Sequence, residues 1–316
     1  MGRTRRLEDR LAALEALRQA PTSEATQAAL QKALTTKTNH VVARAAEIVG
    51  DYQLTELEPN LVDAFERFMV NGQKTDPGCA AKTAIVDALY RMESQEPDVF
   101  LKGIGHVQME SVWGGKEDTA AQLRGASALG LVRINYPNVM LQLAQLLADP
   151  ESDARIAAAR AIGYSGNIEA GEPLLRFKAL AGDSHPQVLC DCFGALLRLT
   201  PEASLSFVAS FLHGDDGPVA ESAAVALGES QLVQAFPFLE AAWEDTFDAE
   251  MRQTILLAIA LLRHERPLEF LIALLRESEA TAKQAFAALR MYQDDDRTWQ
   301  QVEAALRRYG RTELLG

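Results

Sequence analysis

The chain has 316 residues, of which 48% are hydrophobic and 24% charged, so it can bury a core and does not have the composition of a disordered chain. Its formal charge of −13 would repel a phosphate backbone over most of the surface, which argues against a general nucleic-acid binder. Three cysteines without a CxxC pair exclude a disulfide framework and indicate a reducing compartment.

The chain begins with the charged stretch MGRTRRLEDRL, which leads directly into an amphipathic segment. It shows no apolar signal core, and no later run is long enough to span a bilayer. We therefore expect a cytoplasmic protein without membrane insertion. The spacing of apolar residues predicts a helix over residues 6–19, and we assign residues 1–21 as an N-terminal capping helix.

A short pattern then recurs along the chain: two small or aliphatic residues close a helical apolar stripe, and a third residue follows. Between the third residues the intervals are 40, 40, 33, 34, 31, 32 and 30 residues. The copies are Ile48-Val49-Gly50, Ala88-Leu89-Tyr90, Ala128-Leu129-Gly130, Ala161-Ile162-Gly163, Ala195-Leu196-Leu197, Ala226-Leu227-Gly228, Ala258-Ile259-Ala260 and Ala288-Leu289-Arg290. Repetition at this period is typical of stacked helical pairs.

Each copy closes an alanine-rich helix such as 153–163, and another helix with larger apolar residues lies between copies, as at 201–212. Turns such as Asp215-Asp216-Gly217-Pro218 supply N-caps and a proline for the first helical turn. No alternating strand segment is visible. The sequence predicts an all-α fold, a right-handed α-α superhelix of about eight helix pairs, with repeats over residues 22–292.

The longest departure from the repeat is the glycine-rich insertion 103–118, which contains His106, Met109 and Trp113. An exposed aromatic residue in such a loop can form a contact arm or a lid, and we single out these three residues as partner-binding candidates. In the alternative interpretation, Trp113 and Met109 fold back and cover neighbouring helices.

Second helices usually form the concave surface of such arrays. Polar residues occupy this surface in the first four copies, and small or apolar residues occupy it later, which suits a partner peptide or helix. The polar set is Arg44, Glu47, Lys82, Asp87, Gln122, Arg124, Arg155 and Arg160, and the later positions are Gly194, Val225, Leu257 and Ala287. We count Arg124, Arg155, Arg160 and Leu257 among the binding candidates. In the alternative interpretation, the arginines pair with aspartates in the turns.

The chain ends in a segment, 293–316, that predicts a second capping helix after an acidic break. We therefore read residues 1–316 as a single solenoid.

The helix 153–163 (DARIAAARAIG) resembles the second helix of HEAT repeats, particularly the bacterial type named after phycobilisome lyases. Asp149 precedes Arg155 by six residues and Asp76 precedes Lys82 by six, which resembles the Asp/Arg ladder of HEAT turns. The resemblance implies a fold rather than a function, because HEAT arrays serve many roles.

Five scattered histidines and the absence of phosphate-loop, GxSxG or zinc-protease motifs favour a non-catalytic chain, although an enzyme is not excluded by motifs alone. We expect no catalytic residues, no metal and no cofactor. The favoured function is an interaction scaffold or adaptor that binds a protein or peptide on its concave face. The alternative, implied by the resemblance, is a lyase or chaperone subunit that handles a tetrapyrrole.

Overall fold

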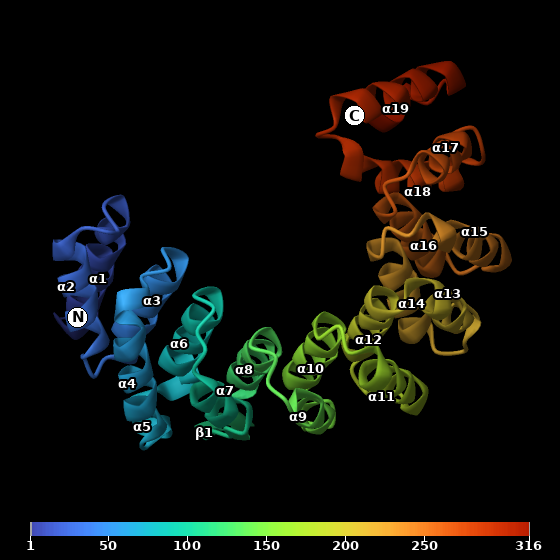
Figure 1. The fold of residues 1–316 in the computed structure, drawn as a ribbon. Coiled ribbons are helices and arrows are strands. Elements are labelled where there is room, and N and C mark those ends of the chain that lie inside the picture. The colour runs from blue at the N-terminus through green and yellow to red at the C-terminus, as the bar shows by residue number, and fades with distance from the viewer. Residues whose placement is uncertain (1, 316) are drawn as a thin grey trace. The chain divides into compact units, whose positions relative to one another are not determined.

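The computed structural model describes the backbone of residues 2–315 and the side chains of residues 7–315. Its contacts divide the chain into two compact units, residues 1–165 and 166–316. Each unit is built from four pairs of antiparallel helices, so the eight predicted helix pairs are confirmed (Figure 1). The prediction of one continuous array stays a prediction.

Unit 1 begins with α1, which packs against α3, and continues with the pairs α2/α3, α4/α6, α7/α8 and α9/α10. The second helices α3, α6, α8 and α10 lie side by side in that order (Figure 1). The bounds are α1 Gly2–Ala16, α2 Glu24–Leu34, α3 Asn39–Asp51, α4 Glu58–Met69, α5 Gly72–Thr75, α6 Ala80–Arg91, α7 Pro97–Ile104, α8 Ala121–Arg133, α9 Val139–Leu146 and α10 Ser152–Tyr164.

Unit 2 contains the pairs α11/α12, α13/α14, α15/α16 and α17/α18, followed by α19. The side chains of Val302, Ala305 and Leu306 in α19 are buried in the apolar core of this unit, and the ring of Trp299 contacts that of Phe286. The bounds are α11 Ile168–Ala181, α12 Pro186–Leu199, α13 Pro201–Ala209, α14 Gly217–Glu229, α15 Phe236–Asp245, α16 Ala249–Leu261, α17 Glu265–Leu274, α18 Glu279–Leu289 and α19 Asp296–Tyr309.

The small residues that mark the repeat allow neighbouring helices to approach closely. A Cβ atom at Gly50 would stand 2.7 Å from the Cα atom of Ala88, and one at Gly228 would stand 2.5 Å from the carbonyl oxygen of Ala258. These distances are too short for any side chain. Glycine is therefore required at these two positions, where one second helix crosses the next.

The turns carry the predicted caps. Asp216 accepts a hydrogen bond from the N–H of Val219 at the start of α14, and Asp248 accepts one from Met251 at the start of α16. Pro186 and Pro218 lie in the first turns of their helices. These turns satisfy the free amides that begin each helix, so the helices start where the sequence predicts.

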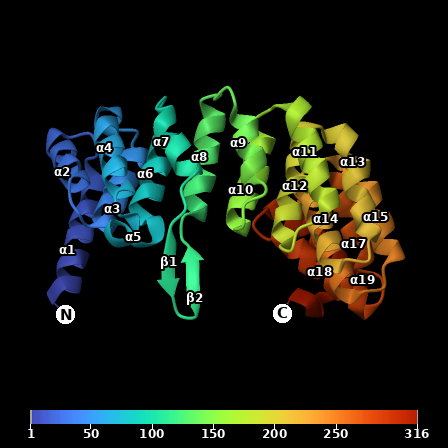
Figure 2. The same cartoon turned by 90° about the horizontal axis from the view of Figure 1, so that it is seen from below.

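The expectation that the chain contains no strands was wrong at one place. Residues Met109–Val112 (β1) and Gly115–Asp118 (β2) form an antiparallel hairpin between α7 and α8. Figure 2 shows the hairpin extending beyond the ends of its neighbouring helices. Among residues 2–315 no helix is long and apolar enough to cross a bilayer.

Candidate interaction site

The inserted segment 103–118 is a structured arm. The register of its hairpin pairs Met109 with Asp118 and Val112 with Gly115, which leaves Trp113 and Gly114 as the two turn residues. Gly114 has φ = +97°, a conformation that glycine adopts without the steric cost of a Cβ atom. The glycine thus allows a tight reversal directly after the tryptophan.

Three apolar side chains of the hairpin are exposed to solvent. Trp113 is 103% exposed, Val112 is 44% exposed and Met109 is 40% exposed. The alternative in which Trp113 folds back over the helices therefore does not describe this structure. An exposed tryptophan with apolar neighbours is the kind of side chain that dominates the binding energy of protein interfaces.

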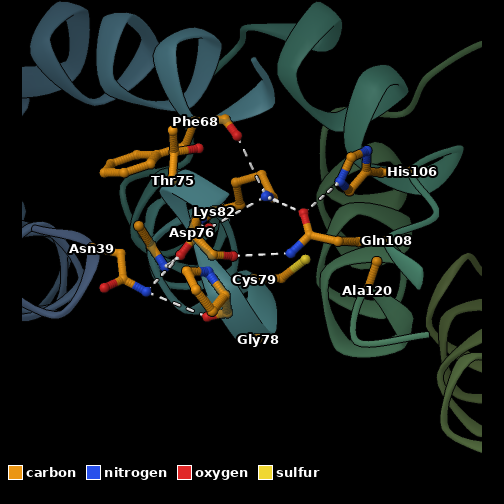
Figure 3. A network of polar contacts seen from close by, with 12 residues as sticks. Asn39, Phe68, Thr75, Asp76, Gly78, Cys79, Lys82, His106, Gln108 and Ala120 are labelled. Carbon is orange, nitrogen blue, oxygen red and sulfur yellow. Dashed lines mark hydrogen bonds and ion pairs between the residues drawn. The ribbon is translucent and has the colours of Figure 1, made fainter. Parts of the chain in front are cut away.

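Gln108 anchors the base of the hairpin. Its side-chain Nε2 donates to the carbonyl oxygen of Asp76 at 2.9 Å and to Oε1 of Glu110 at 2.6 Å, and its backbone N–H donates to Oδ1 of Asp118 at 2.9 Å. The side chain is buried between unit-1 helices, as Figure 3 shows. One glutamine thus connects both strands of the hairpin to the turn that precedes α6.

Lys82 is the buried cation of this network. Its Nζ atom donates to Oε1 of Gln108 at 2.8 Å and lies 3.4 Å from Oδ2 of Asp76, and both charged side chains are fully buried (Figure 3). Asp76 also accepts from the backbone N–H groups of Ala81 and Lys82 and from Nδ2 of Asn39. The ion pair is therefore satisfied on both sides, as burial of charge demands.

Gly72 makes room for this ion pair. A Cβ atom at that position would stand 2.2 Å from Oε1 of Gln108 and 2.8 Å from Nζ of Lys82. Any side chain there would displace the hydrogen bond that joins the hairpin to the helices.

Glu110 provides a second attachment. Its Oε1 atom accepts from the N–H of Gly78 at 2.8 Å and from Oγ1 of Thr119 at 3.0 Å. Desolvation alone would raise the pKa of Glu110, but the hydrogen bonds from Gln108, Gly78 and Thr119 together lower it. The carboxylate is thus held in its charged form at the base of the arm.

Arg124 closes the base on the α8 side. Its guanidinium contacts Oδ2 of Asp118 at 2.7 Å and Oδ1 of Asp149 at 2.8 Å, and it donates to the carbonyl oxygen of His106 at 2.9 Å. Desolvation opposes its charge, but hydrogen bonds to Asp149 and Asp118 outweigh it and raise the pKa of Arg124. Asp118 precedes Arg124 by six residues, the spacing also found for Asp76 and Lys82.

The structure places the other candidates as follows. Arg155 is buried and donates to the carbonyl oxygens of Asp149 and Pro150. Lys82 and Arg124 are buried as well, and both pair with aspartates in the turns, as the alternative interpretation has it. These three side chains therefore do not line an open surface. Arg160 is exposed on α10, and Leu257 is 40% exposed on α16 of unit 2.

His106 is the remaining candidate in the arm. Its ring is half-buried, with Nε2 at 3.4 Å from Oε1 of Gln108. Burial lowers the pKa of His106, although the contact with Gln108 opposes this change. Its position is therefore at the base of the hairpin, whereas Met109 and Trp113 lie in the exposed part.

Gln108, Glu110 and the pairing of Asp118 with Arg124 were not predicted from the sequence. The six-residue spacing could have identified the last of these, because it repeats the spacing of the two aspartate–cation pairs that were recognised. No local pattern marks Gln108, whose main partners lie 26 and 32 residues away in the sequence.

Comparison with known proteins identifies the repeats. Residues 142–228 match the family model of HEAT repeats, which confirms the predicted HEAT type for the helices in that segment. No curated protein matches the chain.

Two solved structures are similar over most of the chain. The complex of CpcE and CpcF of phycocyanin lyase from Nostoc sp. shares 17% identity at a TM-score of 0.37, covering 88% of this chain and 93% of that one. Human deoxyhypusine hydroxylase in complex with glycerol shares 18% identity at a TM-score of 0.32, covering 82% and 91%.

Proposed function

We propose that the chain is a non-catalytic interaction scaffold whose hairpin binds another protein. The observation that carries the proposal is the contrast between the two ends of the hairpin. Gln108, Glu110 and Asp118 fix its base through hydrogen bonds to other parts of unit 1, and Trp113 at its tip is fully exposed.

The anchored base supports binding because it reduces the conformational entropy that the arm would lose when a partner binds. A two-stranded hairpin is marginally stable in water by itself. Here the network at the base orders the arm before any partner arrives, so that association does not have to order it.

The tip supports binding because it offers apolar surface that water solvates poorly. Burial of apolar surface contributes about 25 cal/mol per Å², and tryptophan presents more such surface than most side chains. A partner pocket that covers Trp113 and Val112 would bury both at one point, which is the anatomy of a binding hot spot.

The test is site-specific photo-cross-linking in the cells that produce the protein. A benzophenone amino acid at position 112, with Trp113 intact, is expected to give a discrete protein adduct after irradiation. Trp113→Ala in the same background should abolish that adduct while leaving the helical circular dichroism unchanged, because Trp113 makes no contribution to the core.

Phe247 provides a matched control, since it is a 91% exposed aromatic residue in a turn of unit 2. The benzophenone amino acid at position 246 should not give the same adduct, and Phe247→Ala should leave the adduct at position 112 intact. An adduct at 112 that survives Trp113→Ala, or one made only with lipid, would overturn the proposal.

A further inference from the structure

A hollow of about 480 Å³ opens on the face of unit 1 that is formed by the second helices α3, α6 and α8. Its volume lies within the roughly 300–1,000 Å³ range of ligand sites. The space exists because the residues around it are small: Gly78, Ala80, Ala84 and Ala88 line it. Polar groups from all three helices face the same space, among them Glu47, Thr83, Asp87 and Gln122.

Two of the carboxylates in the hollow are already neutralised. Asp51 accepts a 2.6 Å hydrogen bond from Arg18 and forms an ion pair with Arg91. Oε2 of Glu47 lies 2.8 Å from Nη1 of Arg44, with which it forms an ion pair. Neither side chain therefore needs a further cation.

Asp87 differs from both. Within residues 7–315 its carboxylate has no hydrogen-bond or ion-pair partner, although it is half-buried in the middle of α6. Burial raises the pKa of Asp87, the charge of Glu47 adds to the effect, and Arg91 opposes it. A desolvated carboxylate without a donor is costly, and an external donor would relieve that cost.

We infer that this hollow receives an arginine side chain of the partner protein, with Asp87 as its ion-pair partner. The inference rests on the proposed function and names the chemistry of the partner. A guanidinium carries five N–H donors in a plane, and the hollow offers the carboxylate of Asp87, the hydroxyl of Thr83 and the amide oxygen of Gln122 as acceptors.

The charge of the chain and the position of the hollow favour the same kind of partner. A net charge of −13 attracts basic proteins over the distance of diffusional encounter. Gly78, which lines the hollow, also donates its N–H to Glu110 at the base of the hairpin at 2.8 Å. The hollow therefore adjoins the arm, and one partner can contact both.

The test uses N-acetyl-arginine N-methylamide as the probe and its citrulline analogue as a neutral isostere. Backbone amide resonances of Thr83, Ala84 and Ala88 are followed in a titration of the full-length protein. The arginine probe should give saturable shifts at these residues, and the citrulline analogue should bind about tenfold more weakly because it lacks the charge.

The Asp87→Asn variant should bind the arginine probe at least about fivefold more weakly than the unmodified protein does. Glu56→Gln, which removes an exposed carboxylate elsewhere in unit 1, should bind it like the unmodified protein. Equal binding of the two probes, or unchanged binding by Asp87→Asn, would overturn the inference.

This titration contains no partner protein and leaves Trp113 intact. Arginine binding without a cross-link at position 112 would therefore overturn the proposed function alone. A Trp113-dependent cross-link without arginine binding would overturn only the assignment of the hollow.

Discussion

Lys82 and Gln108 meet inside unit 1, where Nζ of the lysine donates a 2.8 Å hydrogen bond to Oε1 of the glutamine. This bond joins a repeat helix to the inserted hairpin, and both side chains are buried. The stability of the arm is thereby coupled to an ion pair in the interior of the repeat.

Replacing Gln108 tests this coupling. Gln108→Ala leaves the Lys82 ammonium without its nearest acceptor and should reduce the free energy of unfolding by about 1–3 kcal/mol. It should also release the hairpin, which limited proteolysis would detect as faster cleavage between residues 109 and 118. Gln73→Ala removes only an exposed hydrogen bond to Met109 and should change neither measurement appreciably.

The two members of the ion pair should not be equivalent. Asp76→Ala leaves a buried ammonium without a counter-charge and should cost about 3–5 kcal/mol. Lys82→Met should cost less, because Asp76 retains hydrogen bonds from Asn39, Ala81 and the backbone of residue 82. Urea unfolding of both variants measures the difference, and a larger loss for Lys82→Met would contradict the assignment of the donors.

Two helix glycines should respond to the same substitution with opposite signs. Gly228→Ala places a Cβ atom 2.5 Å from the carbonyl oxygen of Ala258 and should destabilise unit 2 by about 1–3 kcal/mol. Gly194→Ala meets no atom within 4 Å, so the better helix propensity of alanine should stabilise the fold by about 0.5–1 kcal/mol. Thermal denaturation of the two variants gives both signs directly.

Asp87 should produce a characteristic dependence of stability on pH. Its pKa is raised in the folded state, chiefly by burial, so the folded chain binds its proton more tightly than the unfolded chain does. The unmodified protein should therefore lose stability relative to Asp87→Asn as the pH rises from the ordinary aspartate pKa of about 4 through the raised value.

The comparison between the two proteins is essential for this prediction, because Glu110 and Asp118 have lowered pKa values and act in the opposite direction. Their contributions are common to both proteins and cancel in the difference. A difference in unfolding free energy that is constant between pH 4 and pH 8 would contradict the desolvation of Asp87.

The repeats could be predicted from the sequence because their signal is local and recurs many times. Alanine and glycine at helical spacing, together with caps such as Asp216, fix the helix pairs one by one. The hairpin could not be predicted in this way. Each strand has four residues, and Trp113-Gly114 is not one of the dipeptides that mark two-residue hairpins.

The residues of the candidate site could be predicted from the sequence only in part, for a related reason. From the sequence, Trp113 in a glycine-rich insertion could either extend into solvent or fold back over the helices, and only the structure shows it exposed. The positions of Arg124 and Arg155 depend instead on partners in three dimensions, and their carboxylate and carbonyl partners draw them into the interior. A charge pattern on a helix does not distinguish a cation that faces a groove from one that binds its own turn.

The attachment of the hairpin through residues 108, 110 and 118 has a consequence for how the protein can change. None of these bonds involves residues 111–114 or the side chains of Lys116 and Glu117. The residues of the tip can therefore be substituted without disturbing the contacts that attach the hairpin to the repeat. Under the proposed function, the residues that contact the partner are not those that attach the arm, so recognition could diverge between related chains, or be redesigned, at little cost in stability.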